Sequence, residues 1–139
     1  MKVLFVCVHN AGRSVMAEAL FNDLADGRGH AESAGTIPGE APHPEVVAAM
    51  AEVGIDVSRH RGRLLTDAMV GSADRLITMG CAVNEEMCPS IVYANAEDWG
   101  LPDPKGQSPE RVREIRDEIR RRVTALLEES SGQLGASGL

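Results

Sequence analysis

Basic residues are in the minority: the chain of 139 residues has 14 Lys and Arg against 21 Asp and Glu, a formal net charge of -7. Nucleic-acid-binding surfaces usually carry a basic excess, so this balance argues against a nucleic-acid partner. The arginines that do gather lie between residues 111 and 122, where Asp117 stands four positions before Arg121 and Glu118 four before Arg122. That order favours ion pairs along a helix, so we expect a solvated helix face there.

Long apolar runs are also missing, and no stretch approaches the roughly 20 apolar residues that a membrane span requires. The short apolar run from Val3 to Val6 is broken by His9 and Asn10, and no small-residue cleavage site follows it. It therefore predicts a first strand and not a signal peptide. Cysteine is scarce as well: 3 cysteines without a secretory context predict reduced thiols in a cytoplasmic protein, with no membrane association and no disulfide framework.

Short β-branched segments alternate with segments of helical period along the chain. We expect strands at Lys2 to Val8, His30 to Ala34, Arg75 to Met79 and Ile91 to Tyr93, and helices at Arg13 to Leu24, from Pro44 with Gly54 at its end, at Leu65 to Val70, and from Pro109 onward. This alternation predicts an α/β fold with a four-stranded parallel sheet flanked by helices on both faces. A single catalytic domain is expected over residues 1–129, followed by a flexible Gly- and Ser-rich tail over residues 130–139.

The segment between the first predicted strand and the first predicted helix reads Cys7-Val8-His9-Asn10-Ala11-Gly12-Arg13-Ser14. A loop that curls onto a helix N-terminus points successive N–H groups inward, and the helix dipole adds positive charge. Gly12 permits the curl, and Arg13 can place a planar fork of N–H donors on two oxygens of a tetrahedral anion. We therefore expect an anion site formed by Val8, His9, Asn10, Ala11, Gly12 and Arg13, with the His9 side chain pointing away.

Cys7 begins this loop, and the same positive field stabilises its thiolate. Ser14 is placed to hydrogen-bond the sulfur, which both holds the thiolate and eases its departure as a leaving group. Cys7 is then a nucleophile aimed at the centre of the bound oxyanion. The alternative is a small buried core thiol, but a core has no need of the polar residues that follow Cys7.

This Cys, followed by five residues and Arg-Ser, resembles the anion loop of the low-molecular-weight tyrosine phosphatase superfamily. The resemblance covers nearly the whole chain and includes Glu32-Ser33-Ala34-Gly35-Thr36 and Leu101-Pro102-Asp103-Pro104. In that superfamily the aspartate of the Asp-Pro pair is the general acid, which implies this role for Asp103. The chemistry agrees, because a carboxylic acid above a bound anion can protonate a leaving oxygen.

A phosphatase of this type needs one cysteine, whereas this chain also has Cys81, directly after the third predicted strand, and Cys88. If the segment between them were helical, their Cα atoms would lie about 10.5 Å apart, beyond the roughly 7 Å that a disulfide allows. The three thiols resemble those of thioredoxin-coupled arsenate reductases in the same superfamily. That resemblance implies a relay in which Cys7 attacks arsenate, Cys81 attacks the Cys7–arsenic adduct and releases arsenite, and Cys88 then bonds to Cys81. Thioredoxin would reduce the resulting disulfide.

Other interpretations stay open. The main alternative is a phosphatase that hydrolyses phosphomonoesters through Cys7 and Asp103, and a third is a non-enzymatic oxyanion or redox sensor. Aromatic residues are only 3% of the chain, whereas many superfamily phosphatases line their cleft with aromatics. A small inorganic anion therefore fits better than a phosphotyrosine peptide: arsenate, with phosphate or sulfate as mimics. Mycothiol or glutaredoxin stay open as electron donors, because Met79-Gly80-Cys81 is a variant of the family sequence.

No cofactor or metal is predicted, and the cysteine spacing offers no zinc site. Some thioredoxin-coupled members bind a potassium ion near the loop, and Asn10, Glu18 and Ser33 match its ligands. The later stretch, where the resemblance implies a carboxylate, reads His60-Arg61-Gly62-Arg63. An arginine there could replace the charge of the ion, so we predict no metal.

Overall fold

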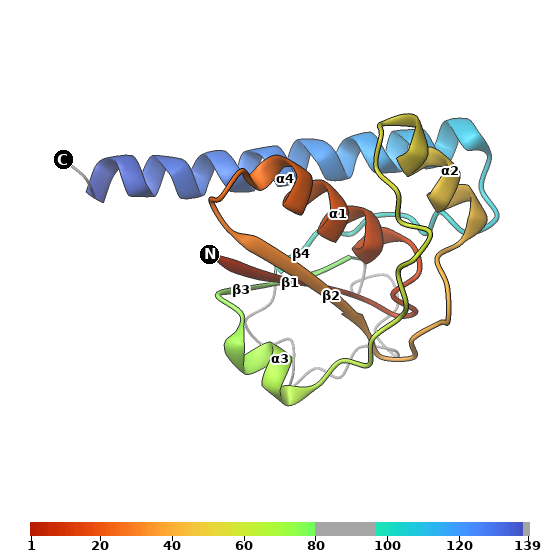
Figure 1. The fold of residues 1–139 in the computed structure, drawn as a ribbon, viewed down its shortest axis with the longest axis horizontal. Coiled ribbons are helices and arrows are strands. Elements are labelled where there is room, and N and C mark those ends of the chain that lie inside the picture. The colour runs from red at the N-terminus through yellow and green to blue at the C-terminus, as the bar shows by residue number, and fades with distance from the viewer. Residues whose placement is uncertain (80–96, 138–139) are drawn as a thin grey trace.

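The structure is a computed structural model that describes residues 1–79 and 97–137. Its elements, in chain order, are β1 (Lys2–Cys7), α1 (Arg13–Ala25), β2 (His30–Gly35), α2 (Pro44–Glu52), α3 (Asp67–Ser72), β3 (Arg75–Thr78), β4 (Glu97–Asp98) and α4 (Pro109–Ser137). The four strands form one sheet in the order β2-β1-β3-β4, and every neighbouring pair is parallel (Figure 1). The predicted α/β fold with a four-stranded parallel sheet is therefore confirmed.

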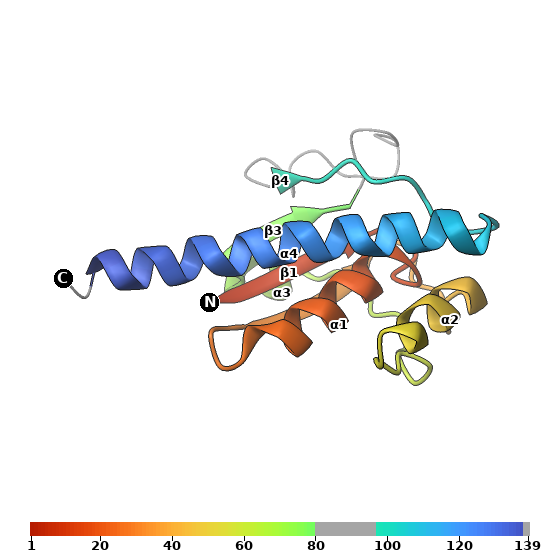
Figure 2. The ribbon, with the colours of Figure 1, turned by 90° about the horizontal axis from the view of Figure 1, so that it is seen from above.

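Helices cover both faces of the sheet, but unequally. Val3 and Phe5 of β1 belong to the main core with α1, α2 and α4, whereas Leu4 and Val6 belong to a smaller cluster with α3. Figure 2 shows α1, α4 and α2 on the viewer's side of the molecule, and Figure 1 shows α3 below the sheet. Because both of its faces are covered, β1 is buried from Val3 to Cys7, which explains its nearly continuous apolar sequence.

The fourth strand of the described sheet is not one of the predicted strands. β4 is the acidic pair Glu97–Asp98, which pairs with Ile77 and Thr78 of β3. A hydrogen bond from Thr78 Oγ1 to Asp98 Oδ1 at 2.7 Å supports the pairing. Acidic residues are poor strand formers, so the sequence pattern does not reveal this strand, whose position at the sheet edge tolerates them. The strand predicted at residues 91–93 lies outside the described residues.

The helices begin close to the predicted positions, with one exception. α1 and α2 begin at Arg13 and Pro44 as predicted, whereas α3 begins at Asp67 instead of Leu65. The reason is the cap: the Thr66 side chain accepts a hydrogen bond from the Met69 N–H at 3.2 Å, which determines where the helix starts.

The long helix α4 buries its apolar side in the main core through Ile115, Ile119 and Val123, and its C-terminal end extends beyond the sheet (Figure 1). It continues to Ser137, through residues for which the composition predicts a flexible tail. None of the helices that the structure describes is long and apolar enough to cross a membrane.

The arginines of α4 form ion pairs, though not all of those predicted. Glu118 pairs with Arg122 at 3.1 Å as predicted, but Arg121 also pairs with Glu118, at 2.7 Å. Asp117 pairs with its neighbour Arg116 at 2.9 Å. Arg116 is buried and not solvated, because its guanidinium turns toward α2. The expectation of a purely solvated face is therefore wrong for this arginine.

Candidate active site

The segment from Cys7 to Ser14 lies at the carboxyl end of β1 and leads directly into α1. Cys7 is the last residue of the strand and Arg13 the first residue of the helix. Gly12 is the N-cap residue, and a glycine brings no side chain to cap the first turn. The N–H groups of that turn can therefore donate hydrogen bonds to an oxyanion.

Three carbonyl groups of this anion loop, residues 8–12, are held by the segment that follows β2. The acceptor and donor pairs are Val8 O with Ile37 N–H at 2.9 Å, His9 O with Gly39 N–H at 2.8 Å, and Ala11 O with His43 N–H at 2.9 Å. The C=O and N–H of a trans peptide point in opposite directions, so the N–H groups that follow these carbonyls face the inside of the loop. This holding segment, residues 37–43, carries no residue-type signal that would reveal its role.

Two glycines near the loop have roles that the sequence does not reveal. Asn10 takes part in the curl with φ of 48°, which Asn tolerates, and Gly12, with φ of -136° and ψ of -98°, lies outside the ordinary helical and extended regions, as a glycine permits. Gly35 makes room for this curl, since a Cβ there would lie 2.5 Å from Val8 O and 2.9 Å from Asn10 N. Gly12 is also approached by a distant loop, because Pro104 Cγ would lie 3.1 Å from a Cβ added at Gly12.

Cys7 is buried, and its Sγ lies 2.8 Å from Ser14 Oγ, the contact expected from the sequence. Ser14 Oγ in turn accepts a hydrogen bond from Asn10 Nδ2 at 2.8 Å. This bond uses a lone pair of the hydroxyl and leaves its hydrogen available, so the arrangement offers an O–H donor to a thiolate.

The His9 side chain is exposed, and its Nδ1 donates to the Ile37 carbonyl at 2.9 Å, on the outer side of the loop. Arg13 Nη1 donates to two backbone carbonyls, Met79 O at 3.0 Å and Leu101 O at 2.7 Å. The arginine therefore ties the start of α1 to the end of β3 and to the segment that leads to Asp103.

Asp103 is exposed on that segment, and its Oδ1 accepts a hydrogen bond from the Lys105 N–H at 3.0 Å. The next residue, Pro104, is buried against Gly12, so the predicted acid lies one residue from a contact with the anion loop. Cys81 and Cys88 lie outside the described residues.

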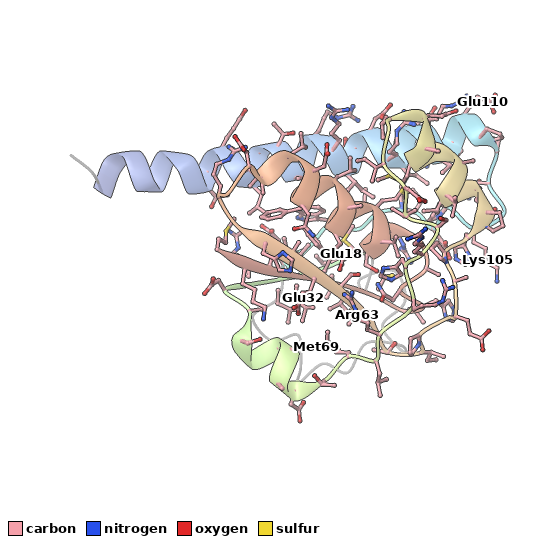
Figure 3. The ribbon with its side chains drawn as sticks, in the orientation of Figure 1. Glu18, Glu32, Arg63, Met69, Lys105 and Glu110 are labelled. Carbon is pink, nitrogen blue, oxygen red and sulfur yellow. The ribbon has the colours of Figure 1, made fainter. Side chains whose placement is uncertain are left out.

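A polar cluster, formed by Glu18, Ser33, His60 and Arg63, lies beside the loop. Figure 3 labels two of its members, Glu18 and Arg63. Glu18 Oε1 accepts hydrogen bonds from Ser33 Oγ at 3.2 Å and Arg63 Nη1 at 3.0 Å, and Oε2 lies 3.7 Å from His60 Nδ1. Burial opposes the ionised form, but the His60 hydrogen bond and the Arg63 charge outweigh it and hold the pKa of Glu18 below its usual value. The spacing of the histidines in the sequence does not predict that His60 belongs to this cluster.

Comparison with known proteins decides the family. Residues 2–134 match the family described as low molecular weight phosphotyrosine protein phosphatase. The chain belongs to this family. Among its relatives in the family, the glutaredoxin arsenate reductase of Synechocystis sp. is 38% identical over 128 residues, which cover 91% of this chain and 95% of that protein.

Solved structures of this phosphatase fold include arsenate reductases. An arsenate reductase in the phosphate binding state is 36% identical, with a TM-score of 0.80 over 92% of this chain and 97% of that one. The thioredoxin-dependent arsenate reductase of Corynebacterium glutamicum is 34% identical, with a TM-score of 0.74 over 95% of this chain and 62% of that one. The resemblance inferred from the sequence, to arsenate reductases of the phosphatase superfamily, is therefore confirmed.

Proposed function

We propose that this protein reduces arsenate to arsenite with Cys7 as the nucleophile. The observation that carries the proposal is the buried Cys7 Sγ, 2.8 Å from the Ser14 hydroxyl at the N-terminus of α1. A tetrahedral oxyanion suits this site, because inward N–H groups and the helix dipole favour negative charge. Arsenate reductases are among the relatives at 36% and 38% identity, and one of them binds phosphate, a tetrahedral anion like arsenate. We expect phosphate and sulfate to bind here as mimics.

In the first step the Cys7 thiolate attacks arsenic, so a sulfur–arsenic bond forms and an arsenic–oxygen bond breaks. The departing oxygen leaves as water after it takes a proton from Asp103. The Nη1 atom of Arg13 is held by the carbonyls of Met79 and Leu101. We therefore expect the other edge of its guanidinium to hold two oxygens of the anion.

In the second step the Cys81 thiolate attacks Cys7 Sγ. A disulfide forms, the sulfur–arsenic bond breaks, and its electron pair stays on arsenic, which leaves as arsenite in the +3 state. Cys88 then attacks Cys81 and frees Cys7, and an external dithiol reduces the Cys81–Cys88 disulfide. We propose thioredoxin as this donor and the cytoplasm, where thiols stay reduced, as the place of reaction. Named relatives use thioredoxin or glutaredoxin, so both belong in the test.

Arsenate-dependent NADPH oxidation with thioredoxin and thioredoxin reductase tests the relay. We expect no turnover for Cys7→Ser and no repeated turnover for Cys81→Ser, because the second lacks the thiol that releases arsenite. Mass spectrometry after one equivalent of arsenate should find a Cys81–Cys88 disulfide in the wild type. Unchanged turnover of Cys81→Ser would contradict the relay, and turnover only with glutaredoxin or mycothiol would change the donor.

Hydrolysis of phosphomonoesters is the second candidate. It is favoured by the family match and by the contact of Pro104 with Gly12, which brings the Asp103 segment to the loop. Cleavage of para-nitrophenyl phosphate should then require Cys7 and Asp103 and be unchanged in Cys81→Ser and Cys88→Ser. Phosphatase activity with no arsenate turnover would replace the first proposal by this one.

A further inference from the structure

A chain of hydrogen bonds connects the polar cluster to Cys7, and its direction is determined by the donors at one end. The Arg63 backbone N–H and His60 Nε2 both lie on Asn10 Oδ1, at 3.0 and 3.1 Å. A backbone N–H only donates, so Asn10 must present its oxygen there and its NH2 group to Ser14. The residues that hold Asn10 therefore also hold the Ser14 hydroxyl, which can donate to a Cys7 thiolate 2.8 Å away.

Two of the oxygens that match a potassium site, on Glu18 and Asn10, already accept hydrogen bonds from donors of the protein. Glu18 Oε1 accepts from Ser33 Oγ and Arg63 Nη1, and Asn10 Oδ1, with two lone pairs, accepts two N–H groups. An alkali cation would need these same oxygen lone pairs and would repel the guanidinium. The residues of this chain therefore do not fit a bound potassium ion.

We propose that Arg63 takes the place of a bound monovalent cation and is a positioning residue for Cys7. Its Nη1 neutralises Glu18 at 3.0 Å, while its backbone N–H holds Asn10 at 3.0 Å. Arg63 thus supplies both the positive charge beside Glu18 and the backbone N–H that sets the direction of the hydrogen-bond chain to Cys7. This inference rests on Cys7 being the nucleophile of the proposed function.

The main chain around Arg63 is held by hydrogen bonds and close packing. Arg63 is therefore fixed in the position from which its guanidinium can take the place of a cation. Gly35 N–H donates to Arg63 O at 2.8 Å, and Gly62 N–H donates to Gly39 O at 3.1 Å. Gly62 also packs so closely that an added Cβ would lie 2.1 Å from Gly39 O. The Arg63 side chain itself is 51% exposed and reaches the 15% exposed Glu18 from the solvent side. Its removal therefore opens the carboxylate to water and to small cations.

The test compares the wild type with Arg63→Ala, Arg63→Lys and Arg61→Ala, in potassium chloride and in choline chloride at equal ionic strength. The measurement is the rate of Cys7 alkylation by iodoacetamide, read by peptide mass spectrometry so that the other cysteines are counted separately. The wild type should react equally fast in both salts. Arg63→Ala should react about fivefold more slowly in choline chloride, the size of a partly exposed ion pair, and potassium chloride should restore the rate.

Two variants serve as controls. Arg63→Lys keeps one positive charge and the backbone donor, so its rate should match the wild type in both salts. Arg61→Ala removes an exposed arginine whose Nη1 donates to the His60 carbonyl at 3.0 Å and should change neither rate. Circular dichroism melting curves in both salts establish that each variant is folded.

Three results overturn the proposal: a saturable response of the wild type to potassium, an Arg63→Ala rate equal to that of the wild type in choline chloride, or a lowered rate that potassium does not restore. If Arg63→Ala does not fold, a potassium-dependent Arg63→Lys overturns it, and a potassium-independent one supports it. The assay contains no arsenate. The alkylation rates can therefore follow the expected salt dependence even if the protein does not turn over arsenate. That result would support the inference and contradict only the proposed function.

Discussion

Two glutamates of this protein each contact two basic side chains, but in very different surroundings. Glu18 is 15% exposed and lies beside the anion loop, where it contacts Arg63 and His60. Glu52 is 40% exposed and lies at the end of α2, where it binds two arginines of α4. The same charge chemistry thus occurs next to the Cys7 thiol and at a contact between two helices.

The Glu52 cluster fastens α2 to α4. Arg113 donates from Nε and Nη2 to both carboxylate oxygens, at 2.7 to 3.0 Å, and Arg116 Nη1 donates to Glu52 at 2.8 Å and to Ala49 O at 2.8 Å. The hydrogen bonds from Arg113 and Arg116 lower the pKa of Glu52 to about 2. Solvent screens this cluster, so its contribution is to local packing, whereas the Glu18 cluster is linked by hydrogen bonds to Cys7.

The largest change in stability is expected from Gly35→Ala, which disturbs the anion loop beside Glu18. An added Cβ would meet backbone atoms of Val8 and Asn10 at 2.5 and 2.9 Å, and neither atom can move without displacing the loop. We expect a loss of about 3 kcal/mol in the free energy of unfolding, measured with urea.

The matched control is Gly71→Ala in α3, where no described atom lies within 4 Å of an added Cβ. Alanine is the better helix former, so a gain of up to ~1 kcal/mol is expected. Equal stability of the two variants would show that the loop does not depend on close packing at Gly35.

Glu18→Gln is expected to have the next largest effect. The amide keeps the shape but removes the charge that faces Arg63 and His60, so we expect a loss of about 2 kcal/mol in the free energy of unfolding. Cys7 alkylation should also slow, because the groups that hold Asn10 lose their partner. Chemical denaturation measures the stability and peptide mass spectrometry measures the alkylation rate. A stable variant with normal alkylation would show that Glu18 has no influence on Cys7.

Glu52→Gln should have a smaller effect on stability and none on Cys7. The melting temperature should fall less than in Glu18→Gln, and added salt should shrink the difference from the wild type, because the cluster is exposed. If Cys7 alkylation slowed as much as in Glu18→Gln, the conclusion that only the Glu18 cluster acts on Cys7 would be wrong.

The smallest effect is the pH dependence of the Glu52 cluster. A pKa of about 2 in the folded state, against an ordinary 4.5, means that folding favours the ionised carboxylate. Its stabilisation is therefore complete above pH 4.5 and is lost as the pH falls toward 2. The difference in melting temperature between the wild type and Glu52→Gln should be constant above this window and shrink within it. If the difference in melting temperature grew on acidification, folding would raise the pKa of Glu52 and not lower it.

Elements with a strong local pattern are predictable, and those held by distant contacts are not. β1 and α1 follow from a buried apolar run and from helical spacing, and both begin at the predicted residues. β4 is an acidic pair that is a strand because Glu97 meets Ile77 of β3, a contact that no local pattern encodes. The curl at Asn10 was missed for the same kind of reason, since Gly35 of another strand makes room for it.

The sequence by itself determined that a thiol stands between a buried strand and a helix, within a loop suited to an oxyanion. It did so because the apolar run, the helix start and the residues of the loop are neighbours in the chain. Only the tertiary structure decided which groups hold that loop. The Arg63 contact with Asn10 and the Gly39 contact with His9 join distant segments, and such hydrogen bonds depend on how two backbones approach in space.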